Sequence, residues 1–299
     1  MLKQITENQQ GLVLISQASS YGGDIVFVHG LRGHLIDTWC PDELRNQEYW
    51  HNWLAKKFPN LNIWSFGYHA EPSEWLDTSE SGVSMPLVDR ASNLLDSLKN
   101  DEIGQEHPLF FVTHSLGGLI VKQVLRRADD SAISNVENHK IIKQTKGIVF
   151  LATPHTGASL ARTFTYWLSF IGRPTVTIEE LERANPTLRD LDRWYRENCN
   201  RLYIDSLVYF EKKPLHPFGL VVDEVTADPH LQGIDSSAVD EDHISIAKPQ
   251  SENANVYKGV NRFIKKHIST PSSLQIPLPN LAVERGLEKE VGYRTEDPQ

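Results

Sequence analysis

The chain has 299 residues, enough for one large domain or two small ones, and 39% of them are hydrophobic, which is enough for a well-buried core. Its 30 Lys and Arg against 39 Asp and Glu give a formal charge of -9, which repels polyanions and argues against nucleic-acid binding. The two cysteines, Cys40 and Cys199, show no CxxC spacing. They therefore argue against a zinc site or a disulfide framework and for a reducing compartment.

The chain shows no sign of export or of a membrane span. Its first ten residues lack the apolar core of a signal peptide, and no later stretch approaches the roughly 20 apolar residues that cross a bilayer. We therefore expect a soluble, cytoplasmic protein. Peripheral membrane contact stays open, since an acidic protein can still touch a membrane through a local apolar patch.

Short apolar runs alternate with longer amphipathic segments, the pattern of parallel strands joined by helices. We expect strands at residues 12–15, 25–28, 62–66, 109–113, 147–151 and 203–210. Helices are expected at 84–98 and 116–127, where apolar residues follow one helical face. This order predicts an α/β fold.

The segment from about residue 156 to 200 is far longer than an ordinary connection between strands, which predicts an inserted helical cap. Residues 178–195 predict a charged amphipathic helix interrupted at Pro186. The preceding part has an apolar stripe whose members are candidates to line a cleft and bind an acyl chain: Leu160, Phe164, Trp167, Leu168 and Ile171. The alternative is that both parts simply pack on the sheet.

After residue 268 the composition changes to Ser, Thr and Pro and then to a charged end. We interpret residues 269–299 as a linker or tail outside a domain that covers 1–268.

The segment Thr113-His-Ser-Leu-Gly117 follows an apolar run and precedes a helical pattern, the context of a nucleophile elbow. Such a turn needs small residues two positions before and after the serine. Gly117 meets this demand, whereas Thr113 replaces the first glycine of the G-x-S-x-G pattern with a β-branched side chain. Ser115 is the candidate nucleophile; the alternative is a serine that merely opens a helix.

A serine nucleophile needs a histidine base and an acid that orients it, and in this topology the acid and then the histidine follow the serine in the chain. His243 is the candidate base, because it lies in a polar loop before an amphipathic C-terminal segment. Glu211, at the carboxyl end of an expected strand, is the first candidate acid. Asp223 is the alternative.

Backbone N–H groups must stabilise the oxyanion of an acyl-transfer reaction. In a nucleophile elbow they come from the residue after the serine and from an early strand-end loop. Leu116 is the first candidate, and Leu31 in the glycine-containing loop 28–34 is the second.

These motifs, in this order, resemble the α/β-hydrolase superfamily, and specifically the serine-active-site-containing esterase and lipase family related to phosphatidylglycerol-remodelling proteins and GPI inositol-deacylases. The matching segments are 25–34 with Thr38-Trp39, 114–123, 147–157 and 242–249. The resemblance implies a mostly parallel eight-stranded sheet flanked by helices, a triad of Ser115, His243 and Glu211 or Asp223, and no metal or organic cofactor. It also implies that His155 shapes a loop near the site.

The preferred function is hydrolysis of a carboxylic ester, with a lipid or lipid-like ester as the substrate. A thioesterase or peptidase would use the same triad. A third hypothesis is a hydrolase-like interaction module with little turnover, suggested by the tail and by Thr113 in the elbow. The resemblance extends to domains at the N-terminus of larger nucleotide-binding receptor-like proteins, which look like effector enzymes. A protein partner or oligomer through the cap or tail stays open.

Overall fold

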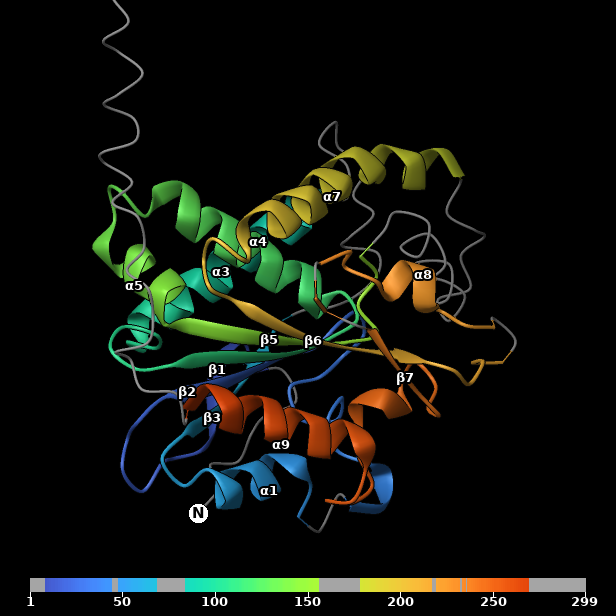
Figure 1. Ribbon diagram of the computed structural model, residues 1–299, viewed down its shortest axis with the longest axis horizontal. Coiled ribbons are helices and arrows are strands. Elements are labelled where there is room, and N and C mark those ends of the chain that lie inside the picture. Colours follow the sequence, from blue (N-terminus) through green and yellow to red (C-terminus); the bar gives the residue numbers. More distant parts are fainter. Residues whose placement is uncertain are drawn as a thin grey trace, which may run out of the picture.

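A computed structural model describes residues 9–44, 48–68, 84–155, 178–216, 219–231, 233–234 and 236–268. Within these residues seven strands form one sheet in the order β1-β3-β2-β4-β5-β6-β7 (Figure 1). The strands are β1 (Gly11–Ser16), β2 (Asp24–Val28), β3 (Asn62–Gly67), β4 (Leu109–His114), β5 (Thr145–Leu151), β6 (Asp205–Glu211) and β7 (Ser236–Val239). All neighbours pair in parallel except β1 and β3. The mostly parallel sheet is confirmed, with one strand fewer in the described residues than the eight expected.

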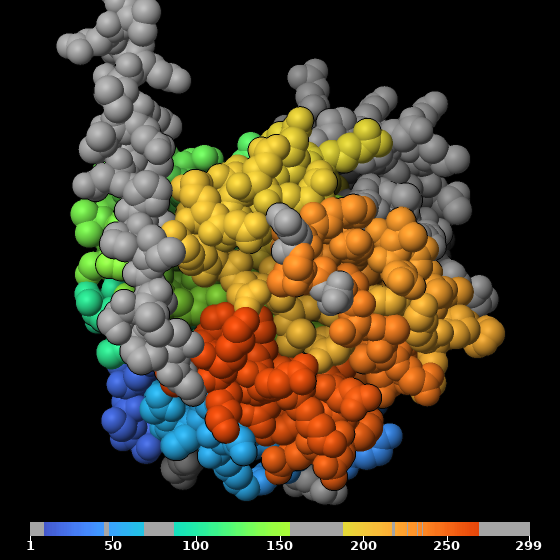
Figure 2. All heavy atoms as spheres, in the orientation of Figure 1, coloured from blue at the N-terminus to red at the C-terminus, as the bar shows by residue number. Residues whose placement is uncertain are grey.

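Helices cover both faces of the sheet, so the molecule has three layers (Figure 1). One layer contains α3 (Ser84–Asn100), α4 (Gly117–Ser131), α5 (Val136–Gln144) and α7 (Ile178–Asn198). The other contains α1 (Trp50–Lys57) and α9 (Asn255–Ile268), where Trp53 packs edge-to-face on Tyr257 with ring centroids 5.5 Å apart. Figure 2 shows this side of the molecule from outside, with N-terminal residues in blue next to the orange-red α9. The short helix α8 (Glu224–Ala227) follows β6.

The central strands are buried on both faces, which explains why they appear in the sequence as continuous apolar runs. Every residue of β2 and β4 is buried. The register pairs Val28 with Thr113, Thr113 with Phe150 and Phe150 with Val208. Strands β2, β4 and β5 therefore end within one residue of the same level, and β6 continues three residues beyond Val208. The loops that follow these strands therefore meet at one edge of the sheet.

The six expected strands are present, with ends that differ by at most two residues. β7 was not predicted, because it is a four-residue edge strand, Ser-Ser-Ala-Val, without an apolar run. Helices α1 and α5 were also missed. They have only 8 and 9 residues, too few for a clear helical period.

The predicted interruption at Pro186 is wrong, because α7 continues through it. A proline inside a helix costs about 3 kcal/mol, and tertiary packing can offset that cost. The turns after the proline supply such packing, since Leu188, Leu191 and Tyr195 lie in the core cluster beside α3 and α4. This half of the segment 156–200 therefore packs on the main fold. Leu160, Phe164, Trp167 and Leu168 lie outside the described residues, as does the tail.

Among the described residues, no helix combines the length and the apolar character needed to span a bilayer.

Candidate active site

Ser115 occupies the turn between β4 and α4 with a φ of +50°. This left-handed conformation costs a residue with a side chain about 1–2 kcal/mol. The turn is fastened to the next strand, because the Ser115 N–H donates to the carbonyl of Leu151 over 2.9 Å. A strained strand-to-helix turn of this kind is the geometry of a nucleophile elbow.

Two glycines allow the loop after β2 to touch this turn. A Cβ on Gly30 would lie 2.8 Å from the Cβ of Ser115, and a Cβ on Gly117 would lie 2.2 Å from the carbonyl oxygen of Val28. Neither distance is sterically possible, so both positions require glycine. The two glycine-containing loops singled out in the sequence are therefore direct neighbours.

Thr113, the departure from the G-x-S-x-G pattern, is accommodated within the sheet. It is fully buried on β4, and its Oγ1 donates to the carbonyl oxygen of Val149 on β5 over 2.8 Å. The side chain therefore replaces the missing glycine without an unpaired hydroxyl.

His243 connects Ser115 to Glu211. Its Nε2 lies 3.1 Å from Ser115 Oγ, and its Nδ1 lies 3.3 Å from Glu211 Oε2. The other oxygen of Glu211 accepts the backbone N–H of Val222 over 2.7 Å. All three side chains are fully buried. A carboxylate at Nδ1 holds the proton on that nitrogen and leaves Nε2 free to accept from the serine hydroxyl.

The structure thus brings together the three residues that the sequence singled out first. Glu211 ends β6, and its carboxylate meets the imidazole. Asp223 directly precedes α8, and its neighbour Val222 contributes the N–H that holds Glu211. The geometry therefore favours Glu211 over Asp223 as the partner of His243.

Two further residues, which the sequence gave no reason to select, hold this arrangement in place. His114 Nε2 donates to the backbone carbonyl of His243 over 2.7 Å, which fixes the loop that carries the imidazole. Tyr68 donates its hydroxyl to the carbonyl of His29 over 2.6 Å and stacks on that ring, which fixes the loop that carries Leu31. His114 is visible next to Ser115 in the sequence, but its partner lies 129 positions away.

We expect three buried histidines to make the free energy of unfolding depend on pH. Burial disfavours the charged ring and lowers the pKa of His29 to about 4 and those of His51 and His114 to about 3. The unfolded chain, with histidine pKa values near 6.5, then binds more protons than the folded one at mildly acidic pH. The free energy of unfolding should therefore fall as the pH drops from about 6.5 towards 3–4.

His51 offers a test of this dependence, because it lies against Phe27 and no described residue bonds either ring nitrogen. We expect His51→Phe to reduce the slope of unfolding free energy against pH, between pH 4 and 6, by about 1.4 kcal/mol per unit. Urea titrations across this range measure the slope. The exposed His139, changed to Gln, is the control. An unchanged slope in His51→Phe would show that this ring is not kept neutral by folding.

Comparisons with known proteins identify the family and the fold of the chain. Residues 25–178 match the family described as "Putative serine esterase (DUF676)", a range that contains the elbow and the early loop. Protein SERAC1 of Danio rerio is 32% identical over 262 residues, which cover 81% of this chain and 38% of that protein. SERAC1 of Homo sapiens is 28% identical over 262 residues, with 82% and 39% covered. The chain therefore spans about two fifths of the length of these relatives.

Among solved structures, the mature lipase BlEst2 of Bacillus licheniformis superposes with a TM-score of 0.53 and 17% identity, over 87% of this chain and 98% of that one. At this identity the match shows a shared fold, that of the α/β-hydrolases. The sequence match over residues 25–178, more than half of the chain, establishes that the chain belongs to the family described as "Putative serine esterase (DUF676)".

Proposed function

We propose that this chain hydrolyses carboxylic esters through an acyl-enzyme, with Ser115 as nucleophile, His243 as general base and Glu211 as the acid that orients it. The observation that carries the proposal is the hydrogen-bonded chain from Ser115 Oγ through both nitrogens of His243 to Glu211 Oε2. A serine hydroxyl is a weak nucleophile at neutral pH, and a bonded imidazole with an orienting carboxylate activates it.

In the first half-reaction Ser115 Oγ attacks the ester carbonyl carbon while His243 Nε2 takes the hydroxyl proton. The tetrahedral intermediate then loses its alkoxide, which leaves as the alcohol after receiving that proton from His243. Water attacks the acyl-serine with His243 again as base, and the carboxylic acid departs. The buried Glu211 carboxylate stabilises the imidazolium in both halves.

The oxyanion would be held by the backbone N–H groups of Leu116 and Leu31. Leu116 is the N-cap of α4, where the helix dipole favours negative charge. A Cβ on Gly30 would lie 3.2 Å from Leu116 N, so the two loops that carry the donor N–H groups are direct neighbours. Neither N–H takes part in a backbone hydrogen bond among the described loops.

A lipid-like substrate rests on the sequence alone. The stripe of Leu160, Phe164, Trp167 and Leu168 is a candidate to bind an acyl chain, and these residues lie outside the described part of the chain. We therefore propose that the substrates are esters with an apolar acyl group. The protein would hydrolyse them either as single molecules in solution or as part of a membrane surface.

A substrate panel tests the reaction class. We expect the purified protein to hydrolyse p-nitrophenyl acyl esters faster than matched acyl thioesters or peptide amides, and to be inactivated by a fluorophosphonate. Faster turnover of thioesters or of peptides would instead identify the protein as a thioesterase or as a peptidase. Absence of both turnover and fluorophosphonate inactivation would instead favour an interaction module.

A further inference from the structure

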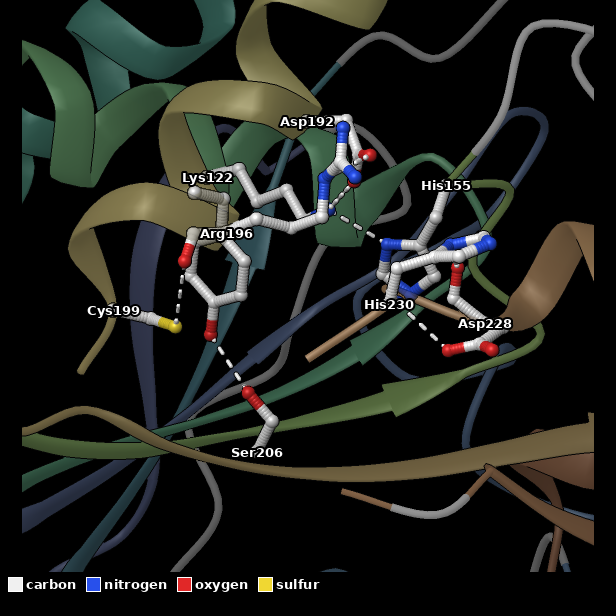
Figure 3. A network of polar contacts seen from close by, with 9 residues as sticks. Lys122, His155, Asp192, Arg196, Cys199, Ser206, Asp228 and His230 are labelled. Atoms are coloured by element: carbon white, nitrogen blue, oxygen red, sulfur yellow. Dashed lines mark hydrogen bonds and ion pairs between the residues drawn. The ribbon is translucent and has the colours of Figure 1, made fainter. Parts of the chain in front are cut away.

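A buried lysine lies on the helix that follows the nucleophile. The side chain of Lys122 on α4 has no exposed surface, and its ammonium lies 2.8 Å from Asp192 Oδ1 on α7 and 2.7 Å from His155 Nδ1 (Figure 3). Arg196 pairs with the other Asp192 oxygen over 3.2 Å. Burial of a charge is costly unless it is paired and hydrogen-bonded, and here Asp192 meets both demands.

This contact fixes the tautomer of His155. An ammonium group only donates, so Nδ1 of His155 must accept, and the single ring proton of a neutral imidazole then lies on Nε2. Burial and, after it, the Lys122 charge lower the pKa of His155 well below its ordinary value, which keeps the ring neutral. His155 is therefore held as an Nε2–H donor.

That donor and a neighbouring hydroxyl are buried without partners. Neither His155 Nε2 nor Thr153 Oγ1 has a hydrogen-bond partner in the described structure, and both side chains are at most 2% exposed. An unpaired buried donor costs about 1–3 kcal/mol. The two unpaired groups lie within three residues of each other, in the loop that follows β5, whose last residue Leu151 accepts the Ser115 N–H. Such a pair indicates a site that is completed by a ligand.

Both groups lie along one face of α4. The missing Cβ of Gly118 would be 2.4 Å from Thr153 Oγ1, and His155 bonds Lys122, four residues further along the helix. Residues four apart share a helical face and differ by about 6 Å in height. The loop that bears the two donors begins directly after Leu151, the last residue of β5, which accepts the Ser115 N–H. This is the carboxyl edge of the sheet, where open α/β folds bind ligands.

We propose that Thr153 and His155 form a second hydrogen-bond-donor site, which binds an oxygen acceptor of the substrate other than the carbonyl that Ser115 attacks. The acceptor is a carbonyl or phosphoryl oxygen, as found in esters that carry a second acyl group or a phosphate. Lys122 and Asp192 act as positioning residues for His155. The inference rests on the proposed ester hydrolysis and specifies its substrate.

Three substrates distinguish between a carbonyl and a phosphoryl oxygen as the acceptor. Dihexanoyl phosphatidylcholine offers a second ester carbonyl and a phosphate, dihexanoylglycerol offers the carbonyl alone, and p-nitrophenyl hexanoate offers neither. We expect Thr153→Val and His155→Phe each to lower kcat/KM for the phospholipid, relative to the p-nitrophenyl ester, about fivefold. An equal loss with dihexanoylglycerol assigns the carbonyl, and a loss confined to the phospholipid assigns the phosphoryl oxygen.

Thr145→Val is the matched control. Thr145 lies at the opposite end of β5, is equally buried, and its hydroxyl donates to the carbonyl of Ile141 over 2.7 Å. Thr145→Val should leave the ratio of kcat/KM for the phospholipid to kcat/KM for the p-nitrophenyl ester unchanged. The proposal is overturned if the ratio stays within twofold of the parent in both site variants, or if all three substrates lose activity equally, which would indicate a structural role only.

A binding measurement tests the donor site independently of the proposed hydrolysis. In a Ser115→Ala background, calorimetry with monomeric dihexanoyl phosphatidylcholine should give a Kd about fivefold weaker when Thr153→Val is added. If the parent hydrolyses none of the three esters, the proposed function fails, while this Kd comparison still decides on the donor site. Equal Kd values would overturn the donor site alone.

Discussion

Ser115→Ala and His243→Ala are each expected to lower kcat for a short acyl ester by about 10⁶-fold, and the double variant is expected to be no slower than either. The reason is that the two side chains form one hydrogen-bonded unit, with Oγ and Nε2 3.1 Å apart, so removal of either leaves the other without a role. Initial rates with p-nitrophenyl butyrate measure the loss.

Ser134→Ala is the control for this experiment, since Ser134 is exposed in the turn after α4 and should leave kcat unchanged. Residual activity of Ser115→Ala above about one hundredth of the parent would mean that another residue attacks the ester. If the fold-loss of kcat in the double variant were the product of the two single losses, the two residues would act separately.

Asp192→Ala is expected to lower the free energy of unfolding by about 3–5 kcal/mol, because it leaves the fully buried Lys122 ammonium without a carboxylate. Urea unfolding followed by circular dichroism measures the change. The double variant Lys122→Met with Asp192→Ala should regain most of the loss, since no uncompensated charge stays in the core.

Asp190 on the same helix offers a matched control. Its side chain is 44% exposed and pairs with Arg126 over 2.7 Å, the kind of surface ion pair that contributes at most about 1 kcal/mol. Equal destabilisation by Asp190→Ala and Asp192→Ala would contradict the account of Lys122 as a buried, paired charge.

The sheet could be predicted because its central strands are buried on both faces and therefore form uninterrupted apolar runs in the sequence. The signal fails where burial is one-sided or short. β7 has two exposed residues among its four, so no pattern separates it from a loop. The continuation of α7 through Pro186 depends on packing against α4, a tertiary contact that local propensity does not contain.

The residue types of the candidate site could be predicted from their order along the chain, because a serine, an acid and a histidine must follow particular strands in this topology. The order left Glu211 and Asp223 as alternatives, since Glu211 ends β6, Asp223 lies in the segment after it, and both precede His243. Only the distance from His243 Nδ1 to Glu211 Oε2 separates them.

The supporting contacts could not be predicted at all. Lys122 and Asp192 lie 70 positions apart, and His114 and the His243 carbonyl lie 129 apart. A lysine on a helix is ordinarily exposed, so nothing local indicates that this one is buried and paired.

The central claim is that Ser115, His243 and Glu211 act as one hydrolytic unit, and kcat of Glu211→Gln against Asp223→Asn tests it most directly. Glutamine keeps the shape of Glu211 and its contact with the Val222 N–H, but it lacks the charge that stabilises the imidazolium. We predict that Glu211→Gln lowers kcat for p-nitrophenyl butyrate by about 10⁴-fold and that Asp223→Asn stays within about tenfold of the parent. A large loss in Asp223→Asn with near-parental activity in Glu211→Gln would contradict the account.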